Sequence, residues 1–268
     1  MIDEFALPPT PFLRSLRIQG RVVWALLMRE IVTRFGRRNL GVLWLFAEPM
    51  LFTLGVSALW SFGGLKGHLA LPVVAFAITG YSSVLMWRNT VSHAKGAIHA
   101  NINLLYHRNV LVADVLLARI LLEMTGATAS FVLLTTFFVS TELIQPPVDL
   151  LRVVAGWLML AWFGGSLAIM LGAATAFSAL VERLWTPVAY LLFPMSGAAF
   201  LVDWLPPAGQ RIVLLLPMVH GVEYLRFGFF GASIRTHYDM AYMASINLCL
   251  TFLGLVLLRF AARRVEVE

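Results

Sequence analysis

The sequence predicts an all-α, polytopic membrane protein with six transmembrane helices, because it is strongly apolar, contains several long hydrophobic segments and distributes its basic residues unevenly. Of its 268 residues, 60% are hydrophobic and 13% are charged, and the mean hydropathy is +0.83. Soluble domains carry roughly a quarter of charged residues. A spanning helix needs about 20 mostly apolar residues, because its backbone must satisfy its own hydrogen bonds in hydrocarbon. We expect residues 1–268 to form a single transmembrane domain.

The first expected element, residues 12–38, is an amphipathic helix that lies flat on the cytoplasmic surface. Its apolar residues recur at helical spacing and its arginines share another face: the apolar positions are Phe12, Leu16, Val23, Leu27 and Ile31, and the arginines are Arg14, Arg17 and Arg21. Such a helix either anchors the chain or provides a platform for a cytoplasmic partner. The first 41 residues hold seven arginines and no uninterrupted apolar core, so we expect no cleavable signal peptide.

Six apolar segments meet the length requirement for spanning the bilayer. They are residues 42–62, 69–87, 117–141, 153–180, 185–204 and 241–259. Within the fourth span, small residues permit close contact between helices: Gly164, Gly165 and Gly172. The single cysteine, Cys249, lies in the last span, so no intrachain disulfide can form.

The basic residues predict the orientation. With the N-terminus in the cytoplasm, 15 of the 20 Lys and Arg residues are cytoplasmic, as the positive-inside rule requires. The five on the outer side are Lys66, Arg152, Arg211, Arg226 and Arg235. Both termini are therefore expected in the cytoplasm. The pI near 10 follows from this topology and from anionic headgroups, so no nucleic acid partner is expected.

The connector between the second and third spans predicts a short cytoplasmic helix at residues 93–106. Residues 88–116 are too polar to cross a membrane and too rich in Ala, Leu, Ile and His for a flexible linker. The helix is either a solvated connector or a docking site for a soluble motor. A separate motor is expected because the chain has no G-x-x-x-x-G-K-[ST] phosphate loop with which to bind ATP itself. The candidate coupling residues are His93, Lys95, His99, Asn101, Asn103 and Tyr106, with Arg29 and Arg34 of the preceding helix.

Residues 206–231 predict a re-entrant helical segment that enters from the periplasmic side and acts as an exit gate. The apolar run from Ile212 to Val219 is too short to span and is broken by Pro217. The candidate gate residues are Pro217, His220, Glu223 and Arg226. We interpret the last three as a hydrogen-bonded brace. No metal site is expected here, nor at His93, His99 and His107, whose spacing does not place them on one helical face.

Three stretches, in order along the chain, resemble one family. RFGRRNLGVLWLFAEP (34–49) resembles the entry motif of type-2 ABC exporter permeases, in which a basic helix runs through a Leu-Gly-x-x-Trp turn into a first span containing a proline. LLYHRNVLVADVLLARILLE (104–123) is similar to the family's return from its coupling helix. LPMVHGVEYLRFGFFG (216–231) is similar to a signature near the last span of capsular polysaccharide permeases.

The resemblance implies a type-2 ABC exporter transmembrane domain that forms a homodimeric channel and pairs with two copies of a separate ATPase. ATP and Mg would be bound by that ATPase, and no cofactor is expected in this chain. The implied cargo is a lipid-linked capsular polysaccharide crossing the inner membrane of a Gram-negative bacterium. Periplasmic and outer-membrane partners of the polysaccharide co-polymerase and export type are also implied. O-antigen and teichoic-acid-type polymers stay open as cargo.

The residues that would line a conduit are harder to choose. Sugars stack on aromatic faces, and the aromatic candidates within or near spans are Trp44, Tyr81, Trp162 and Tyr190, with ordinary helix packing as the alternative. The ionisable candidates are Arg37, Arg38 and Glu48. Glu48 either pairs with Arg38 or Arg119, or contacts substrate. The remaining tryptophans at span ends fit the interfacial aromatic belt: Trp60, Trp87, Trp185 and Trp204.

Other functional classes remain open to different degrees. Export of a small molecule or lipid would use the same permease architecture. A proton-driven transporter would rely on Glu48 and Glu123, but the chain shows no internal repeat. A membrane enzyme is disfavoured, because no cluster of nucleophile, base and metal ligands occurs in or near the spans.

Overall fold

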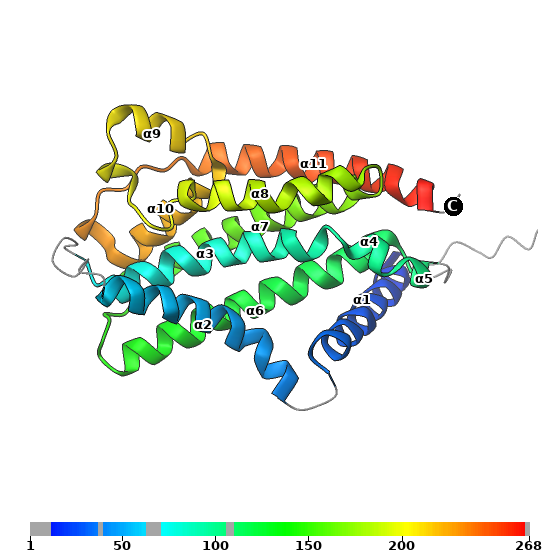
Figure 1. The fold of residues 1–268 in the computed structure, drawn as a ribbon, viewed down its shortest axis with the longest axis horizontal. Coiled ribbons are helices and arrows are strands. Elements are labelled where there is room, and N and C mark those ends of the chain that lie inside the picture. The colour runs from blue at the N-terminus through cyan, green and yellow to red at the C-terminus, as the bar shows by residue number, and fades with distance from the viewer. Residues whose placement is uncertain (1–11, 37–39, 63–70, 106–109, 266–268) are drawn as a thin grey trace, which may run out of the picture.

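A computed structural model describes residues 12–36, 40–62, 71–105 and 110–265, and within these ranges the chain is helical with no strand (Figure 1). The long helices lie side by side in one bundle: α2 (Leu40–Phe62), α3 (Val73–Ala94), α6 (Val112–Ser140), α7 (Leu150–Thr175), α8 (Ala179–Met195) and α11 (Met240–Val265). The predicted all-α class is thus confirmed.

Several of these helices are apolar enough for a membrane. Among the described residues, three could cross one alone, namely Val112–Ser140, Leu150–Thr175 and Met240–Arg264. A fourth is possible if Pro207–Val213 and Pro217–Ser233, which are bent by 106° at their junction, form one span. The count of six spans stays a prediction.

Helix α7 is the centre of the bundle and packs against α3, α10 (Pro217–Phe230) and α11. The close contacts depend on glycine, as the sequence predicted. A Cβ at Gly164 would lie 2.9 Å from Trp87 Cα, and one at Gly172 would lie 3.2 Å from the carbonyl oxygen of Ala94. Trp87 and Trp185 are 0% and 5% exposed and pack edge to face with centroids 6.3 Å apart. Assigning these two to an interfacial belt was therefore wrong, because they form the core between α3 and α8.

Helix α8 differs from the predicted span 185–204. It begins at Ala179, where the Ser178 hydroxyl accepts a hydrogen bond from the Leu180 N–H at 3.2 Å. It ends at Met195, just after Pro194, and the chain then turns through Gly197 at a φ of +79°. The short 3-10 helix η2 (Val202–Trp204) follows. Capping and a proline therefore shift the whole helix towards the N-terminus.

The prediction of one helix at 93–106 was wrong. Helix α3 continues to Ala94, a turn follows at Lys95 and Gly96, and two short helices come next: α4 (Ala97–Ala100) and α5 (Ile102–Leu105). Between them, the buried Asn101 side chain donates to the carbonyl of Ala97 at 2.9 Å. This local hydrogen bond competes with a continuous helix.

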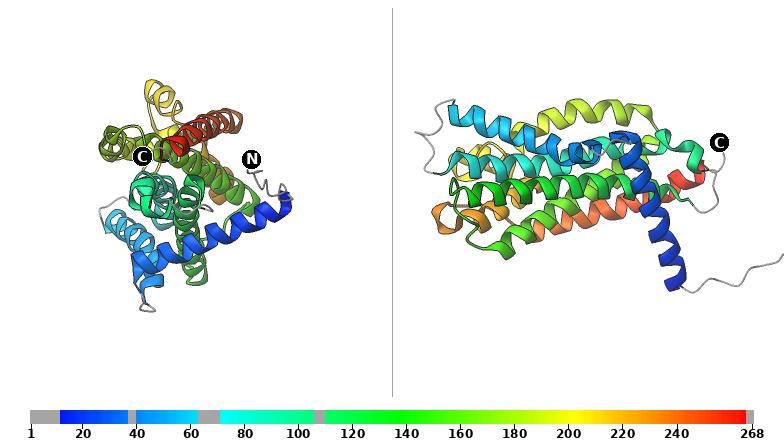
Figure 2. Two further views of the ribbon diagram at one scale, coloured as in Figure 1. Left: turned by 90° about the vertical axis from the view of Figure 1, so that its right-hand side faces the viewer. Right: turned by 90° about the horizontal axis from the view of Figure 1, so that it is seen from below.

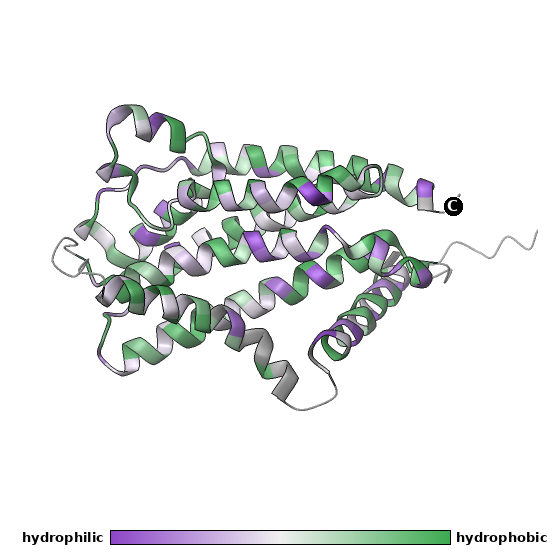
Figure 3. Cartoon of the chain, viewed as in Figure 1, coloured by the Kyte–Doolittle hydropathy of each residue, from purple (hydrophilic) through white to green (hydrophobic). Residues whose placement is uncertain are grey.

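Helix α1 (Phe12–Phe35) runs across one end of the bundle, nearly perpendicular to the other long helices (Figure 2). The same end holds α4, α5 and the last turn of α11, whereas α9 (Pro207–Val213) and α10 lie at the opposite end (Figure 1). Hydrophilic and hydrophobic residues occur side by side along α1 (Figure 3), and Leu16 and Trp24 are exposed. Helix α1 therefore lies at the end of the bundle opposite to α9 and α10.

Candidate functional site

Two cross-paired ion pairs join α1 to α6. Arg34 contacts Glu123, whose side chain is 10% exposed, and Glu30 lies 3.0 Å from Arg119 Nε. In each helix the acidic and basic residues are four positions apart, so the two i, i+4 pairs meet as a ladder. We call Glu30, Arg34, Arg119 and Glu123, together with His93, the charged junction.

The charged junction extends to the end of α3 and the turn after it. His93 Nδ1 lies 3.1 Å from Glu123 Oε2, and Arg119 donates to the His93 carbonyl at 3.0 Å. Nearby, Arg29 donates to the Asn101 side-chain oxygen at 2.7 Å. Helix α1 is therefore fastened both to α6 and to the segment that joins α3 and α5.

The structure brings four of the predicted coupling residues together here: His93, Asn101, Arg29 and Arg34. Lys95 and His99 instead contact α8 and α7. Lys95 donates to the Thr186 hydroxyl of α8 at 3.1 Å, and His99 Nε2 lies 3.3 Å from the Thr175 carbonyl oxygen of α7. Asn103 is exposed, and Tyr106 lies outside the described residues.

Sequence reasoning missed Glu30 and paired Arg119 wrongly. Arg119 engages Glu30 and not Glu48, while Arg38, the other expected partner of Glu48, lies outside the described residues. Glu48 itself is exposed. The signal that could have found the ladder is the complementary spacing of Glu30 with Arg34 and of Arg119 with Glu123. It was visible, but nothing in the sequence places α1 beside α6.

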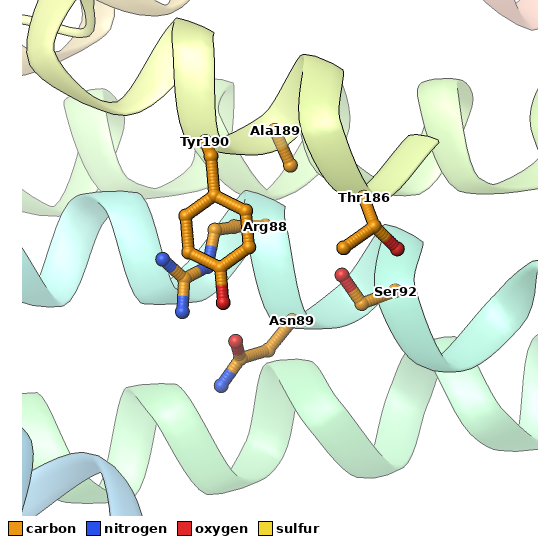
Figure 4. A pocket seen from close by; sticks show the side chains of 6 residues that line it. All are labelled: Arg88, Asn89, Ser92, Thr186, Ala189 and Tyr190. Atoms are coloured by element: carbon orange, nitrogen blue, oxygen red, sulfur yellow. The ribbon is translucent and has the colours of Figure 1, made fainter. Parts of the chain in front are cut away.

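A polar cavity of ≈ 170 Å³ lies between α3 and α8. We call it the α3–α8 groove, and Figure 4 shows its lining: Arg88, Asn89 and Ser92 from α3, and Thr186, Ala189 and Tyr190 from α8. The Arg88 guanidinium carbon lies 5.8 Å from the centroid of the Tyr190 ring, and Tyr190 is 67% exposed. The groove thus combines a cation, polar side chains and an exposed aromatic face.

The other conduit candidates fall into two groups. Tyr81 is buried and packs edge to face with Phe193 at 5.8 Å, and Trp162 donates to the Thr251 hydroxyl of α11 at 3.0 Å. These two contacts are packing contacts between helices. Arg37 and Arg38 lie outside the described residues, and of Trp44 only the backbone, within α2, is described.

The predicted gate residues lie at the break between α9 and α10. Pro217 is the first residue of α10. His220 Nε2 lies 2.8 Å from the Leu214 carbonyl oxygen, and its Nδ1 accepts from the Asp239 N–H at 2.9 Å. His220 therefore ties α10 to the residues on either side of it.

Glu223 and Arg226 are both fully buried on α10. The Glu223 carboxylate accepts from the N–H groups of Val202 and His237, at 3.3 and 3.0 Å. The Arg226 guanidinium donates to the carbonyls of Gly197, Ala198 and Phe200, each at 2.6 Å, and stacks 3.8 Å from the Phe76 ring centroid. Within the described residues, His220, Glu223 and Arg226 hydrogen-bond to backbone groups of residues 197–202, 214 and 237–239 and not to one another, so a brace among the three side chains stays a prediction.

The chemistry of these sites is that of binding and mechanical connection. Over the described ranges, no group of three or more His, Cys, Asp or Glu side chains could hold a metal ion. The charged residues instead join helices to one another. Apolar helices, a junction at one end and a polar groove along one face define a class of protein, the multi-helix membrane protein.

The comparisons with known proteins narrow that class. No protein-family model matches the chain. It is 43% identical over 259 residues to the capsule polysaccharide export inner-membrane protein CtrC of Neisseria meningitidis serogroup A, covering 97% of this chain and 98% of that protein. It is 40% identical, with the same coverage, to the capsule polysaccharide export inner-membrane protein BexB of Haemophilus influenzae. The polysialic acid transport protein KpsM of Escherichia coli is 27% identical over 91% of this chain. The chain belongs to the family of capsule polysaccharide export inner-membrane proteins.

Proposed function

We propose that this chain is the channel-forming permease of an ATP-driven exporter that moves lipid-linked capsular polysaccharide across the bacterial inner membrane. The identity to CtrC and BexB over nearly the whole length carries the proposal. It favours capsule over O-antigen, teichoic-acid-type polymers or small molecules as cargo. The chain is a transport subunit and not an enzyme, and we place ATP and Mg in two copies of a separate ATPase.

The proposed topology has six spans, with both termini in the cytoplasm. The end of the bundle that holds α1, α4 and α5 is then cytoplasmic. Arg29, Arg34, Lys95, Arg263 and Arg264 all belong to elements at this end, as the positive-inside rule requires. The opposite end, with α9 and α10, faces the periplasm, and we propose that the bent pair is re-entrant there. A periplasmic polysaccharide co-polymerase or export protein would meet this end.

Two copies of the chain are proposed to enclose the conduit. Helices α2 and α8 both pack against α3 and lie on the same side of the bundle (Figure 2). Their exposed residues include apolar side chains, as at Leu51 and Leu191. A two-fold axis beside this face would bring the two α3–α8 grooves towards each other.

The mechanism follows from the connections between the elements. ATP binding closes the ATPases, and their motion reaches α4 and α5 and the α1 platform. The charged junction passes it to α3 and α6, because Glu123 and Arg119 contact both α1 and His93. The first and fifth spans, α2 and α8, then separate to admit the lipid-linked end of the polymer. The α9–α10 pair seals the outer mouth at rest.

The test is purification of the chain from its host in mild detergent. We expect an ATPase with a phosphate loop to co-purify, and reconstituted vesicles to take up capsular polysaccharide in the presence of ATP. Replacing residues 97–105 with a Gly/Ser linker should release the ATPase while the permease still folds. A chain that purifies alone and moves solute under a proton gradient would refute the proposal.

A further inference from the structure

The α3–α8 groove contains an arginine whose charge is not neutralised within the described part of the chain. Arg88 follows directly after the predicted span 69–87 on α3, and a cation at the edge of a span is costly unless it faces water or an anion. The contact shown for its guanidinium is the Tyr190 ring. A guanidinium has five N–H donors, and an aromatic face satisfies none of them through an oxygen atom. Donors are therefore free to bind a ligand in the cavity.

The hydroxyl groups of the groove add to this excess of donors. Ser92 Oγ accepts from Trp185 Nε1 at 3.0 Å, and Thr186 Oγ1 accepts from Lys95 Nζ at 3.1 Å. Each oxygen is already used as an acceptor, so each O–H can still donate. Ser92 and Thr186 lie opposite each other across the groove (Figure 4). Asn89 contributes an amide, which can also donate.

No carboxylate competes for this site among the six lining residues. The nearest acidic residue along α8, Glu182, has Oε1 beside Gly96 in the turn after α3, 3.4 Å from where a Cβ on that glycine would stand. Glu123 is engaged by His93 and Arg34 at the charged junction. A cation, three neutral donors and no acidic lining residue together define an anion site.

An exposed aromatic face lies beside these donors. Positions 88 and 92 of α3 share one helical face, as do 186 and 190 of α8. Arg88 packs on Tyr190, and the Ser92 and Thr186 hydroxyls lie opposite each other. Tyr190, being 67% exposed, offers a face on which a sugar ring can stack.

We propose that the α3–α8 groove binds an oxyanion carried by the glycan cargo, with Arg88 as its charged ligand and Tyr190 as the stacking platform. The inference rests on the proposed function and names the part of the cargo that this site recognises. The oxyanion is either the carboxylate of an acidic sugar or the phosphate of the lipid anchor. One relative is named a polysialic acid transport protein, so at least one similar protein is named for an acidic glycan.

The test measures binding to the full-length chain in lipid nanodiscs. The probes are a soluble oligomer of sialic acid, an uncharged glucose oligomer of similar length, and discs made with or without phosphatidylglycerol. We expect Arg88→Gln to weaken the anionic interaction roughly tenfold to a hundredfold, Arg88→Lys to retain part of it, and Tyr190→Ala to weaken glycan binding without unfolding the exposed site. Arg183→Gln, an exposed arginine of α8 outside the groove, should change nothing.

The arms of the experiment separate the two sources of the oxyanion. Arg88-dependent binding of the sialic acid oligomer assigns the site to the polymer, whereas an effect confined to phosphatidylglycerol assigns it to the anchor. Equal binding of charged and uncharged oligomers with no lipid effect, or equal losses in Arg88→Gln and Arg183→Gln, would overturn the inference. If wild-type vesicles export polysaccharide and Arg88→Gln exports it equally well, the site is wrong and the proposed function stands. If wild-type vesicles export none, the proposed function itself fails.

Discussion

Charged side chains inside this bundle are held in two different ways, and the difference indicates their roles. Arg226 is 0% exposed and donates to three backbone carbonyls at 2.6 Å, so it fixes the loop after α8. Glu123 is held by side chains from two other helices, Arg34 and His93. Contacts between side chains can be exchanged as helices shift, whereas a backbone cage resists movement. We therefore expect the contacts of Glu123 to change when the helices move and those of Arg226 to persist.

The Arg34–Glu123 pair can be tested by a double-mutant cycle. Because the two side chains are 26% and 10% exposed, we expect Arg34→Gln and Glu123→Gln each to lower the free energy of unfolding by about 1–3 kcal/mol. The double variant should lose about 1 kcal/mol less than the sum of the two. Unfolding in a mixed-detergent titration measures this. Arg21→Gln, an exposed arginine of the same helix, should stay within about 0.5 kcal/mol of wild type, and strict additivity would show that the pair is not coupled.

At the scale of elements, the sequence predicts helices well where one apolar run decides them. The spans expected at 117–141, 153–180 and 241–259 correspond to α6, α7 and α11. Prediction from the sequence fails where the ends of a helix depend on contacts between residues that are distant along the chain. Asn101 separates α4 from α5 while it accepts from Arg29 of α1, and no local pattern reveals that partner. Of the residues that line the α3–α8 groove, the sequence singled out only Tyr190, as a conduit candidate; no local pattern reveals that α8 lies beside α3 and brings Tyr190 to Arg88.

Because α7 packs closely on α3, we expect one added methyl group at Gly164 to destabilise the fold. A Cβ at Gly164 would lie 2.9 Å from Trp87 Cα, and a backbone atom cannot move aside as a side chain can. We expect Gly164→Ala to lower the free energy of unfolding by about 1–3 kcal/mol. Gly55→Ala in α2 is the matched control, because nothing lies within 4 Å of its Cβ position, and it should be neutral or slightly stabilising. Equal melting temperatures for the two variants would contradict the close contact.

We expect the membrane barrier to become leaky when the hydrogen bonds of His220 at the α9–α10 break are removed. His220 bonds the Leu214 carbonyl before α10 and the Asp239 N–H before α11, so His220→Ala leaves both groups unpaired at a cost of about 1–3 kcal/mol. We expect the complex to assemble while its vesicles become leaky to small ions or export less polysaccharide. A fluorescent ion-flux assay measures the barrier, with the exposed Arg211→Gln of α9 as control. An unchanged barrier together with unchanged export would show that this segment is not a gate.

At the scale of the whole molecule, two different surfaces are exposed and only one is expected to meet a second copy. Helix α11 exposes Leu248, Phe252 and Leu255, an apolar surface suited to lipid. The face formed by α2, α3 and α8 also exposes apolar residues, but it contains the polar α3–α8 groove. Lipid tails cannot satisfy the donors of that groove. A second copy that encloses an aqueous conduit can leave them hydrated and accessible to cargo.

Cysteine cross-linking distinguishes the two surfaces, because the chain has one cysteine, the exposed Cys249 of α11. In a Cys249→Ser background we expect Thr186→Cys or Tyr190→Cys to form a disulfide-linked dimer in native membranes. Residues near a two-fold axis meet their own counterparts, and both residues are exposed on α8 and line the α3–α8 groove. Leu248→Cys and the wild-type Cys249 should stay monomeric on the same non-reducing gel. If cross-links form through α11 and not α8, the two grooves face lipid, and a conduit between two copies along α8 is excluded.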